Sequence, residues 1–355
     1  VKNSVNNFDR TITIPDYTFD GKQWSTYSEI TYNHNREKSD WVGGLNAYTD
    51  NFKELPKDNF PKRNYDQSTI GGFIQHTWKA TDWLQTETGA RGDYVIDYGF
   101  VFLPRISALF KISPALTSRL GGGLGYKTPT IFTEETERLQ FRYVLPVNAD
   151  ANKLEKSYGV NFDVNYRTSL ADRISLSINQ LFFYTRINDP LILMDAPDNQ
   201  YQLINADGFT DTKGWETNIK LGYGDFKLFI GYTFTDAQLN AGGIKKENPL
   251  TARHRLNNVL MYEVEDKWKL GLEAYYFGKQ ALNDGTAGKP YWIFGFMTEK
   301  IWERFSLFLN FENFTDTRQT KFGPIYNGTV TKPVFRDIYA PLDGFVVNGG
   351  LKLKL

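Results

Sequence analysis

Residues 115–132, ALTSRLGGGLGYKTPTIF, set a pattern that much of the chain repeats. The first half alternates between two kinds of residue, as a β-strand does when its two faces meet different surroundings. Pro129 then ends the strand because proline has no N–H to donate. A polar segment follows. One alternating set is mostly apolar, namely Leu116, Ser118, Leu120, Gly122, Leu124 and Tyr126, and the other is small or charged, namely Thr117, Arg119, Gly121, Gly123 and Gly125.

The same order of alternating strand, stop and connection predicts about sixteen strands. No segment shows a convincing helical period, so we expect very little helix. The glycines around Gly122 predict a bend or the close approach of another backbone. The expected strands cover residues 8–14, 24–33, 41–51, 67–79, 83–95, 104–112, 116–127, 154–167, 173–193, 201–223, 226–239, 253–264, 267–279, 291–301, 304–314 and 345–355.

Composition restricts the class of protein. Aromatic residues make up 16% of the 355 residues, yet hydrophobic residues reach only 41%. No run approaches the roughly 20 apolar residues of a transmembrane helix. Transmembrane β-barrels combine these features because their apolar residues occupy alternate positions. The balance of 41 basic and 41 acidic residues gives no electrostatic case for nucleic acid, and the absence of cysteine excludes disulfides and thiolate sites.

The late strands predict which side chains face lipid. Their apolar sets carry aromatic residues at the ends, where amphipathic rings lie at a membrane interface. A soluble β-sandwich or propeller is the alternative, but such sheets rarely repeat strands this long. We expect Trp215, Ile219, Leu221, Leu228, Ile230 and Leu272 to contact lipid, and Glu216, Lys220, Lys269 and Glu273 to face the lumen.

The connections alternate between short and long, which is typical of periplasmic turns and extracellular loops. The short ones lie at 34–40, 80–82, 113–115, 168–172, 224–225, 265–266 and 302–303. The long ones lie at 52–66, 96–103, 128–153, 240–252, 280–290 and 315–344. This alternation puts the C-terminus on the side of the short turns. If the number of strands is even, the N-terminus lies on the same side.

Several motifs together resemble TonB-dependent outer-membrane receptors. They are GYKTPTIF at 125–132, LEKS at 154–157, RHRL at 253–256 and ENFTDTR at 312–318, within a region of similarity from about Leu103 onward. The resemblance implies a bacterial outer-membrane location, a barrel of about 22 strands, an N-terminal plug domain and the energy-coupling protein TonB as a partner. We find no plug or coupling box, so we expect residues 1–355 to be part of such a barrel.

Candidate ligand contacts lie in connections that the pattern places outside the cell. Aromatic rings and an arginine suit a flat or anionic metal chelate. Packing within the loops is the alternative for any one of them. The candidates are Tyr98, Phe100, Phe102, Phe141, Arg142 and Tyr143. We expect the last three to reach over the mouth from the loop at 128–152, while Glu134 and Glu135 face solvent or form ion pairs.

Inside the barrel, the residues expected to face a plug are Arg119, Glu216, Lys220 and Glu273. We see no nucleophile–base pair, no metal-ligand spacing among His34, His76 and His254, and no cofactor motif, so we predict no enzyme, metal site or cofactor. The favoured function is import of a scarce solute of the iron–siderophore type, energised through TonB. A passive porin of sixteen strands is the alternative, and an adhesin or structural barrel is more remote.

Overall fold

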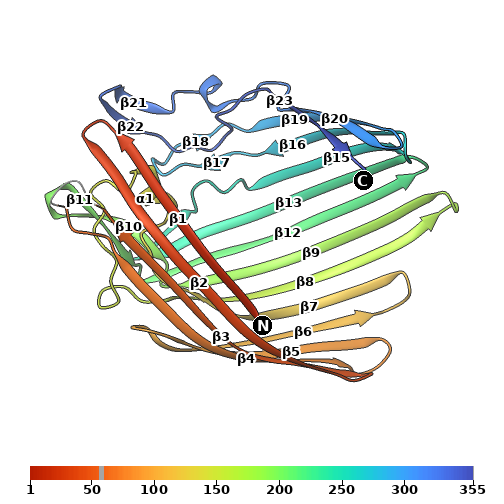
Figure 1. Ribbon diagram of the computed structural model, residues 1–355, viewed down its shortest axis with the longest axis horizontal. Coiled ribbons are helices and arrows are strands. Elements are labelled where there is room, and N and C mark those ends of the chain that lie inside the picture. Colours follow the sequence, from red (N-terminus) through yellow and green to blue (C-terminus); the bar gives the residue numbers. More distant parts are fainter. Residues whose placement is uncertain (56–59, 355) are drawn as a thin grey trace.

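The computed structural model describes residues 1–55 and 60–354 and consists almost entirely of one antiparallel β-sheet (Figure 1). This sheet has 17 strands, of which the short β14 (Ile244–Glu247) lies beside β13. The others are β1 (Lys2–Ile14), β2 (Tyr17–Asn35), β3 (Ser39–Glu54), β4 (Tyr65–Lys79), β5 (Leu84–Val95), β6 (Gly99–Lys111), β7 (Leu116–Lys127), β8 (Glu155–Leu170), β9 (Ile174–Asn188), β12 (Gly208–Tyr223), β13 (Phe226–Ala241), β15 (His254–Val264), β16 (Trp268–Phe277), β19 (Tyr291–Ile301), β20 (Phe305–Glu312) and β23 (Val346–Leu353).

Each long strand pairs with the next one along the chain, from β1 to β23. The sheet curves into a barrel wall, with short turns at one end and long loops at the other (Figure 1). Both β1 and β23 have their terminal ends on the short-turn side, as the phase of the connections predicts. No pairing between β1 and β23 is present among the described residues, and the expected total of about 22 strands stays a prediction.

Short helices and two-stranded hairpins lie at the long-loop end of the barrel. They are α1 (Glu134–Arg138), the hairpin β10 (Leu191–Ala196) and β11 (Gln200–Asn205) with η1 (Pro197–Asn199), β17 (Gln280–Ala281) with β18 (Ala287–Gly288), η2 (Gln319–Lys321), and β21 (Tyr326–Thr329) with β22 (Lys332–Phe335). In the described part of the chain, no helix is both long and apolar enough to cross a membrane.

Two expected strands are interrupted, so these predictions were wrong in detail. The strand expected at 173–193 ends at Asn188, where Asp189 adopts a positive φ of 50° and Pro190 has no N–H to donate. Residues 191–205 then form the β10–β11 hairpin, which also removes the first residues of the strand expected at 201–223. Apolar alternation continues through both breaks, and this hides them in the sequence.

The prediction of a long loop at 96–103 was also wrong. A tight turn of three residues replaces it, with Asp97 at a φ of 70°, and β6 already begins at Gly99. Because proline has no N–H to donate, Pro104 had suggested that a strand starts at residue 104. In the structure β6 pairs with β7 only from Arg105 onward, so Pro104 lies outside the β6–β7 pairing. Residues 56–59, in the expected loop at 52–66, and residue 355 lie outside the described residues.

Cross-strand register separates the two faces of the sheet as the sequence predicts. Trp215 is opposite Phe182 and Phe234, and Ile219 is opposite Ile178 and Ile230. Leu221, Leu228, Leu260 and Leu272 form a further apolar row on the same face. Glu216, Lys220 and Glu273 lie on the opposite face, because successive strand residues alternate.

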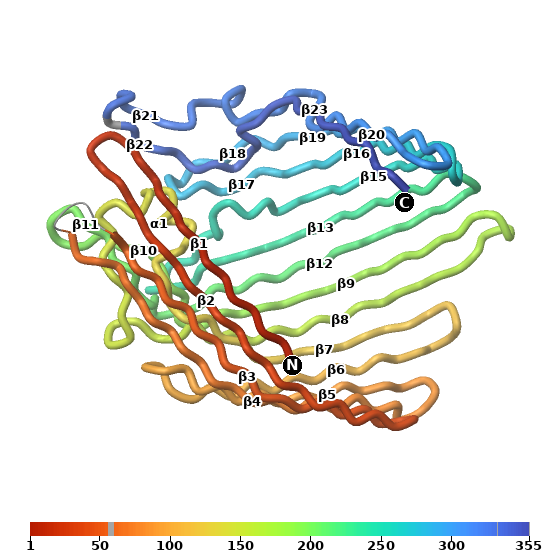
Figure 2. Tube along the Cα trace, viewed as in Figure 1, coloured from red at the N-terminus to blue at the C-terminus, as the bar shows by residue number. Residues whose placement is uncertain are grey.

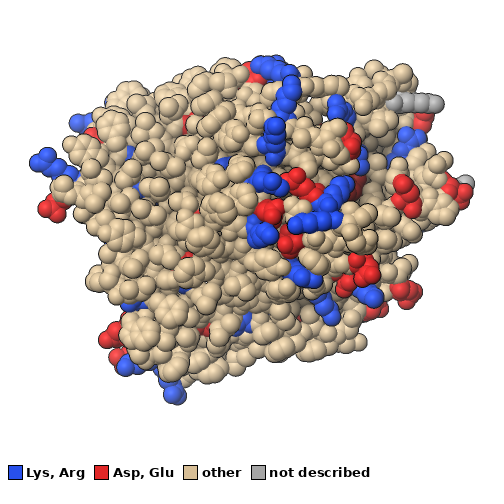
Figure 3. Space-filling view, turned by 180° about the vertical axis from the view of Figure 1, so that it is seen from behind, with Lys and Arg blue, Asp and Glu red and all other residues tan. Residues whose placement is uncertain are grey.

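The apolar rows form the outer face of the barrel. Figure 3 shows the wall that lies behind β1 and β2 in Figure 1: few charged side chains interrupt its broad surface, and most gather towards the long-loop end. Stacked Trp215 and Phe234, whose ring centroids are 4.3 Å apart, lie on the long-loop side of the Ile219 row. Phe226 and Tyr262, with centroids 4.8 Å apart, lie on its other side. Aromatic rings thus flank an aliphatic belt.

Replacing Ile219 with Arg should destabilise the folded barrel by about 2–4 kcal/mol, because this row is halfway between the aromatic rings and would bring a charge to the bilayer midplane. The matched control is Asn218→Arg, one residue away on the inner face, which should cost much less. Urea unfolding in lipid vesicles measures both. Equal losses of stability would show that the assignment of the faces is wrong.

Glycines in the opening stretch allow neighbouring strands to approach. A Cβ on Gly122 would lie 2.8 Å from the carbonyl oxygen of Gly159, and one on Gly123 would lie 3.1 Å from that of Pro104. These crowding atoms are backbone atoms of β8 and β6, so the close neighbours are adjacent strands of the same sheet.

Gly122→Ala should therefore destabilise the barrel by about 1–3 kcal/mol through overpacking against β8. Gly43→Ala is the matched control, since its Cβ would make an ordinary contact, 3.6 Å from the carbonyl oxygen of Phe73. Thermal unfolding followed by the heat-dependent mobility shift on gels compares the two. A loss in Gly43→Ala as large as in Gly122→Ala would contradict the packing argument.

Candidate functional site

The connection between β7 and β8, residues 128–154, folds over the long-loop end of the barrel, and we call it the cap. Figure 2 traces it in yellow behind β1 and β2. It is anchored near its start by Gln67 on β4, whose Nε2 donates to the Pro129 carbonyl oxygen at 2.8 Å. We expected very little helix in the chain, and the five-residue α1 lies in this loop.

An aromatic cluster fixes the cap to the inner wall. Phe141 is 0% exposed and stacks on Phe19 of β2, with ring centroids 4.4 Å apart. Phe132 meets the Phe141 ring edge-on at 5.5 Å, and Phe52 and Ile131 complete the buried core. The prediction that Phe141 reaches over the mouth was therefore wrong, because burial of its ring against β2 and β3 is what holds the loop.

A buried ion pair lies beside this cluster. Arg63 and Glu54 have side chains that are 2% and 3% exposed, and the Arg63 Nε donates to Glu54 Oε2 at 2.8 Å. The Arg63 guanidinium also donates to the Phe141 carbonyl oxygen and lies 5.2 Å from the Phe19 ring centre. Burial alone would lower the pKa of Arg63, but its hydrogen bonds to Glu54 raise the pKa overall. Arg63 is thus a charged link between wall and cap.

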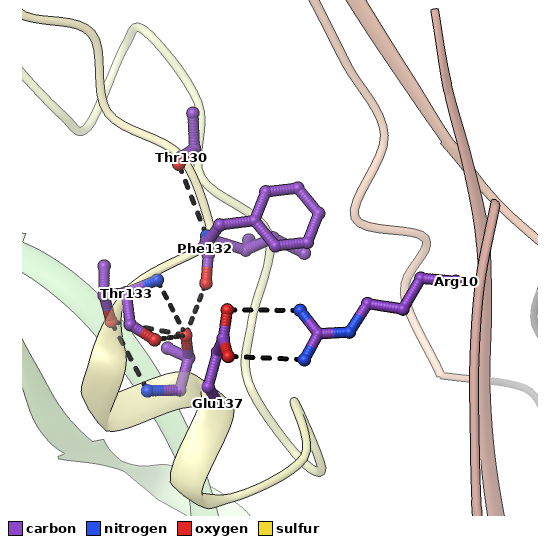
Figure 4. A network of polar contacts seen from close by, with 7 residues as sticks. Arg10, Thr130, Phe132, Thr133 and Glu137 are labelled. Atoms are coloured by element: carbon purple, nitrogen blue, oxygen red, sulfur yellow. Dashed lines mark hydrogen bonds and ion pairs between the residues drawn. The ribbon is translucent and has the colours of Figure 1, made fainter. Parts of the chain in front are cut away.

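Helix α1 connects the cap to the first strand. Thr133 caps the helix by accepting from the Thr136 N–H at 3.3 Å, and the Thr136 hydroxyl accepts from the Thr133 N–H. Glu137 lies on this helix, and its two carboxylate oxygens accept from Arg10 of β1 at 3.1 and 3.3 Å (Figure 4). Glu134 is exposed on the same helix, as we expected.

Two further contacts extend the cap across the barrel. Tyr201 of β11 donates its N–H to the Tyr143 carbonyl oxygen at 2.8 Å. On the other side, Arg138 lies 3.4 Å from Asp337, a 6% exposed residue in the loop between β20 and β23. The cap therefore contacts the first strands, the β10–β11 hairpin and the last long loop.

The other two residues of the expected cap centre keep accessible side chains. Tyr143 is 45% exposed, and Arg142 Nη2 donates to its hydroxyl at 3.2 Å. The Arg142 guanidinium lies 4.9 Å from the Tyr143 ring centre and 5.9 Å from that of Tyr17. Together these groups present a cation, a phenol and an aromatic face, which suits an anionic or aromatic ligand.

The candidates at 98–102 do not join this group. Tyr98 packs on the buried cluster of Val95, Val101 and Leu154, and burial, aided by the charge of Asp97, raises its pKa. Phe100 and Phe102 are 67% and 56% exposed on β6, on the same face as the lipid-facing Ile106. Both rings thus belong to the first residues of β6 and not to the loop expected at 96–103, and their contact with a ligand stays a prediction.

Polar side chains form ordered rows on the inner face. Asn179 donates to Asn165 at 3.0 Å, and Asn165 donates to Asp163 at 2.6 Å. Further along, Asn218 donates to Glu216 at 2.6 Å. The four expected lumen residues, Arg119, Glu216, Lys220 and Glu273, all lie on this face, while their contact with a plug stays a prediction.

Sequence reasoning missed Arg10, Glu54 and Arg63. Each is an ordinary charged residue with no motif around it, and Arg10 and Arg63 have partners in the cap that are far away along the chain. Arg63 and Phe141, for example, are separated by 78 positions. Only the three-dimensional approach of the cap to β1–β3 identifies them.

Known outer-membrane proteins resemble this chain in sequence and in fold. Residues 2–314 match the family described as "TonB dependent receptor-like, beta-barrel". The iron-regulated outer membrane virulence protein of Vibrio cholerae is 22% identical over 273 residues, which cover 70% of this chain and 40% of that protein.

Solved structures show the same fold at low identity. The ferric enterobactin receptor PfeA of Pseudomonas aeruginosa superposes with a TM-score of 0.68 at 15% identity, covering 94% of this chain and 54% of that one. The copper transporter OprC gives 0.72 at 12% identity, with coverages of 95% and 57%. The siderophore receptor PirA of Acinetobacter baumannii gives 0.69 at 14%, with 99% and 59%. The chain thus spans about half the length of these proteins.

Proposed function

This chain belongs to the TonB-dependent receptor family, whose β-barrel domain it carries, and from that premise we propose that it forms the barrel of a receptor that imports an iron–siderophore chelate. Its location is the bacterial outer membrane. The family is one of transport receptors, so we propose import without catalysis. Energy would come from TonB, acting through a plug domain within the barrel.

The observation that supports this function best is the cap. A passive porin needs an open path for solutes, whereas here a loop held by a buried ion pair and an aromatic cluster covers the barrel end. A loop held firmly across the entrance suits a receptor that selects its ligand. The names of the similar proteins, an iron-regulated outer-membrane protein and receptors for ferric enterobactin and siderophores, favour an iron chelate.

We propose different roles for the candidate ligand residues. Arg142 and Tyr143 would contact the ligand, because their side chains are accessible on the cap. Phe141 would support them from below. Phe100 and Phe102 would anchor the barrel at the membrane interface, and Tyr98 would pack the β5–β6 turn.

Inside the lumen, Arg119, Glu216 and Glu273 remain proposed contacts of the plug. Their inward position and polar character fit a surface that a hydrated protein domain can cover. Lys220 receives a different role below.

The proposal is tested by uptake of ⁵⁵Fe-labelled siderophores in iron-starved cells that produce the full-length protein. We expect uptake that requires the gene, stops when TonB is deleted, and falls at least about tenfold in an Arg142→Ala/Tyr143→Ala variant, through loss of a charged contact and a stacking contact. Lys62→Ala, an exposed cation outside the cap, is the matched control and should transport normally.

The rival functions predict other results. Uptake that persists without TonB and extends to any small solute would indicate a porin. Unchanged growth on every limiting nutrient, together with lost cell attachment, would indicate an adhesin or structural barrel. Either result would contradict the proposed function.

A further inference from the structure

A cavity lies far from the cap, at the short-turn end of the inner wall. Its volume is about 770 Å³, within the range of small-molecule sites. The ends of β8, β9, β12 and β13 line it. Three basic residues dominate the lining, and we call them the basic shelf: Arg167, Arg173 and Lys220.

The sheet register brings these groups together. Arg167 is opposite Ser177, and Ser177 is opposite Lys220, so two cations flank a hydroxyl in one inward-facing row. The Lys220 ammonium lies 5.2 Å from the ring centre of Phe229, the next residue in that row. Arg173 comes from the β8–β9 turn at the edge of the same cavity.

The shelf carries more positive charge than its surroundings neutralise. In the described part of the chain, none of its three cations forms an ion pair, and all three are exposed. Lys227 also lines the cavity, but it forms an ion pair with Glu263 at 2.7 Å, a carboxylate that Lys269 shares at 3.0 Å. The one carboxylate in the lining is Asp172, which is exposed in the turn.

Neighbouring acids are engaged elsewhere. Asp163 and Glu216 lie four residues further along their strands towards the long-loop end, and their oxygens accept from Asn165 and Asn218. The row of asparagines therefore separates these carboxylates from the shelf. A guanidinium and an ammonium remain free to bind anionic oxygens.

We propose that the basic shelf binds the carboxylate or phosphate oxygens of a small anionic solute at the periplasmic end of the lumen. This inference rests on the proposed function, which it deepens by assigning an anionic substrate class and an exit station for it. The cavity faces the lumen and has the size of a small-molecule site, and the shelf residues supply donors from three separate segments. A solute leaving the cap region would meet this site before reaching the periplasm.

The test uses the full-length receptor, purified in detergent micelles, with citrate as the probe and isothermal titration calorimetry as the readout. We expect citrate to bind, with an affinity that falls as salt rises. The neutral ester triethyl citrate should not bind. Arg167→Gln/Lys220→Gln should weaken citrate binding by about tenfold or more, since each substitution removes a charge-assisted contact.

The matched control is Arg105→Gln, which removes an inner-face arginine that already lies 3.6 Å from Glu87 and should leave citrate affinity unchanged. Equal weakening in this control, or unchanged binding in the double variant, would overturn the proposal. So would a full-length receptor that binds no citrate, the result expected if a carboxylate of the protein itself occupies the shelf. Because the assay measures no transport, its outcome is independent of the siderophore uptake test.

Discussion

Arg63→Ala should release the cap from the barrel wall while the barrel stays folded. The substitution leaves Glu54 as a buried carboxylate without its cation and removes the donor to the Phe141 carbonyl oxygen. Breaking a buried pair by deleting one partner costs about 3–5 kcal/mol, because the remaining charge has lost both water and its partner. This loss should appear as local opening of residues 128–154. Amide hydrogen exchange and limited proteolysis of that segment measure it.

The control for this prediction is Lys62→Ala, at the adjacent exposed position. It removes the same charge type from the same loop but touches neither Glu54 nor the cap, so exchange rates in 128–154 should not change. An Arg63→Ala variant whose cap is as protected as that of the wild type would contradict this prediction.

Phe141→Ala should open the cap to a similar extent through a different interaction. The ring is fully buried between Phe19 and Phe132, and replacing a buried phenylalanine with alanine costs about 3–5 kcal/mol, through lost burial and the cavity left behind. Protease sensitivity at 128–154 should rise, while the heat-dependent gel shift of the barrel should change little.

Phe100→Ala makes the same chemical change on the outer face of β6, where the ring is 67% exposed. It should leave the cap intact. A cap that resists protease equally in Phe141→Ala and in the wild type would show that the aromatic cluster does not hold it. The double variant Arg63→Ala/Phe141→Ala should lose less than the sum of the two single effects, since both residues hold the same segment to the wall and opening of the cap breaks both interactions.

The wall of the barrel was largely predictable from the sequence. Alternation gave β7 and β19 with the bounds that the structure has, and it assigned Ile219 and Lys220 to opposite faces. This success has a physical reason, because a strand between lipid and a polar lumen must alternate at every residue. Alternation does not predict the end of a strand where the apolar pattern continues across a turn, as at Asp189. It also misplaces the start of a strand that runs through a proline, as at Pro104.

The site was predictable only in part. The sequence indicated the cap by its length and polar composition, and it indicated Arg142 and Tyr143 by their chemistry. It could not indicate that Phe141 is buried, because a lone aromatic in a polar loop has no period that reveals its partner. Arg63 could not be found either, since its role depends on a loop 78 residues away.

The proposed function, in which the cap lies across the entrance, has the central consequence that the cap must move away from the wall for the ligand to enter. Because the chain has no cysteine, the pair Arg10→Cys and Glu137→Cys can be joined selectively by a short, reducible thiol cross-linker in place of the native ion pair. In cells that make the full-length receptor, the account predicts that cross-linking abolishes siderophore uptake, that reduction restores it, and that either single cysteine variant transports normally. Undiminished uptake by the fully cross-linked receptor would contradict the claim.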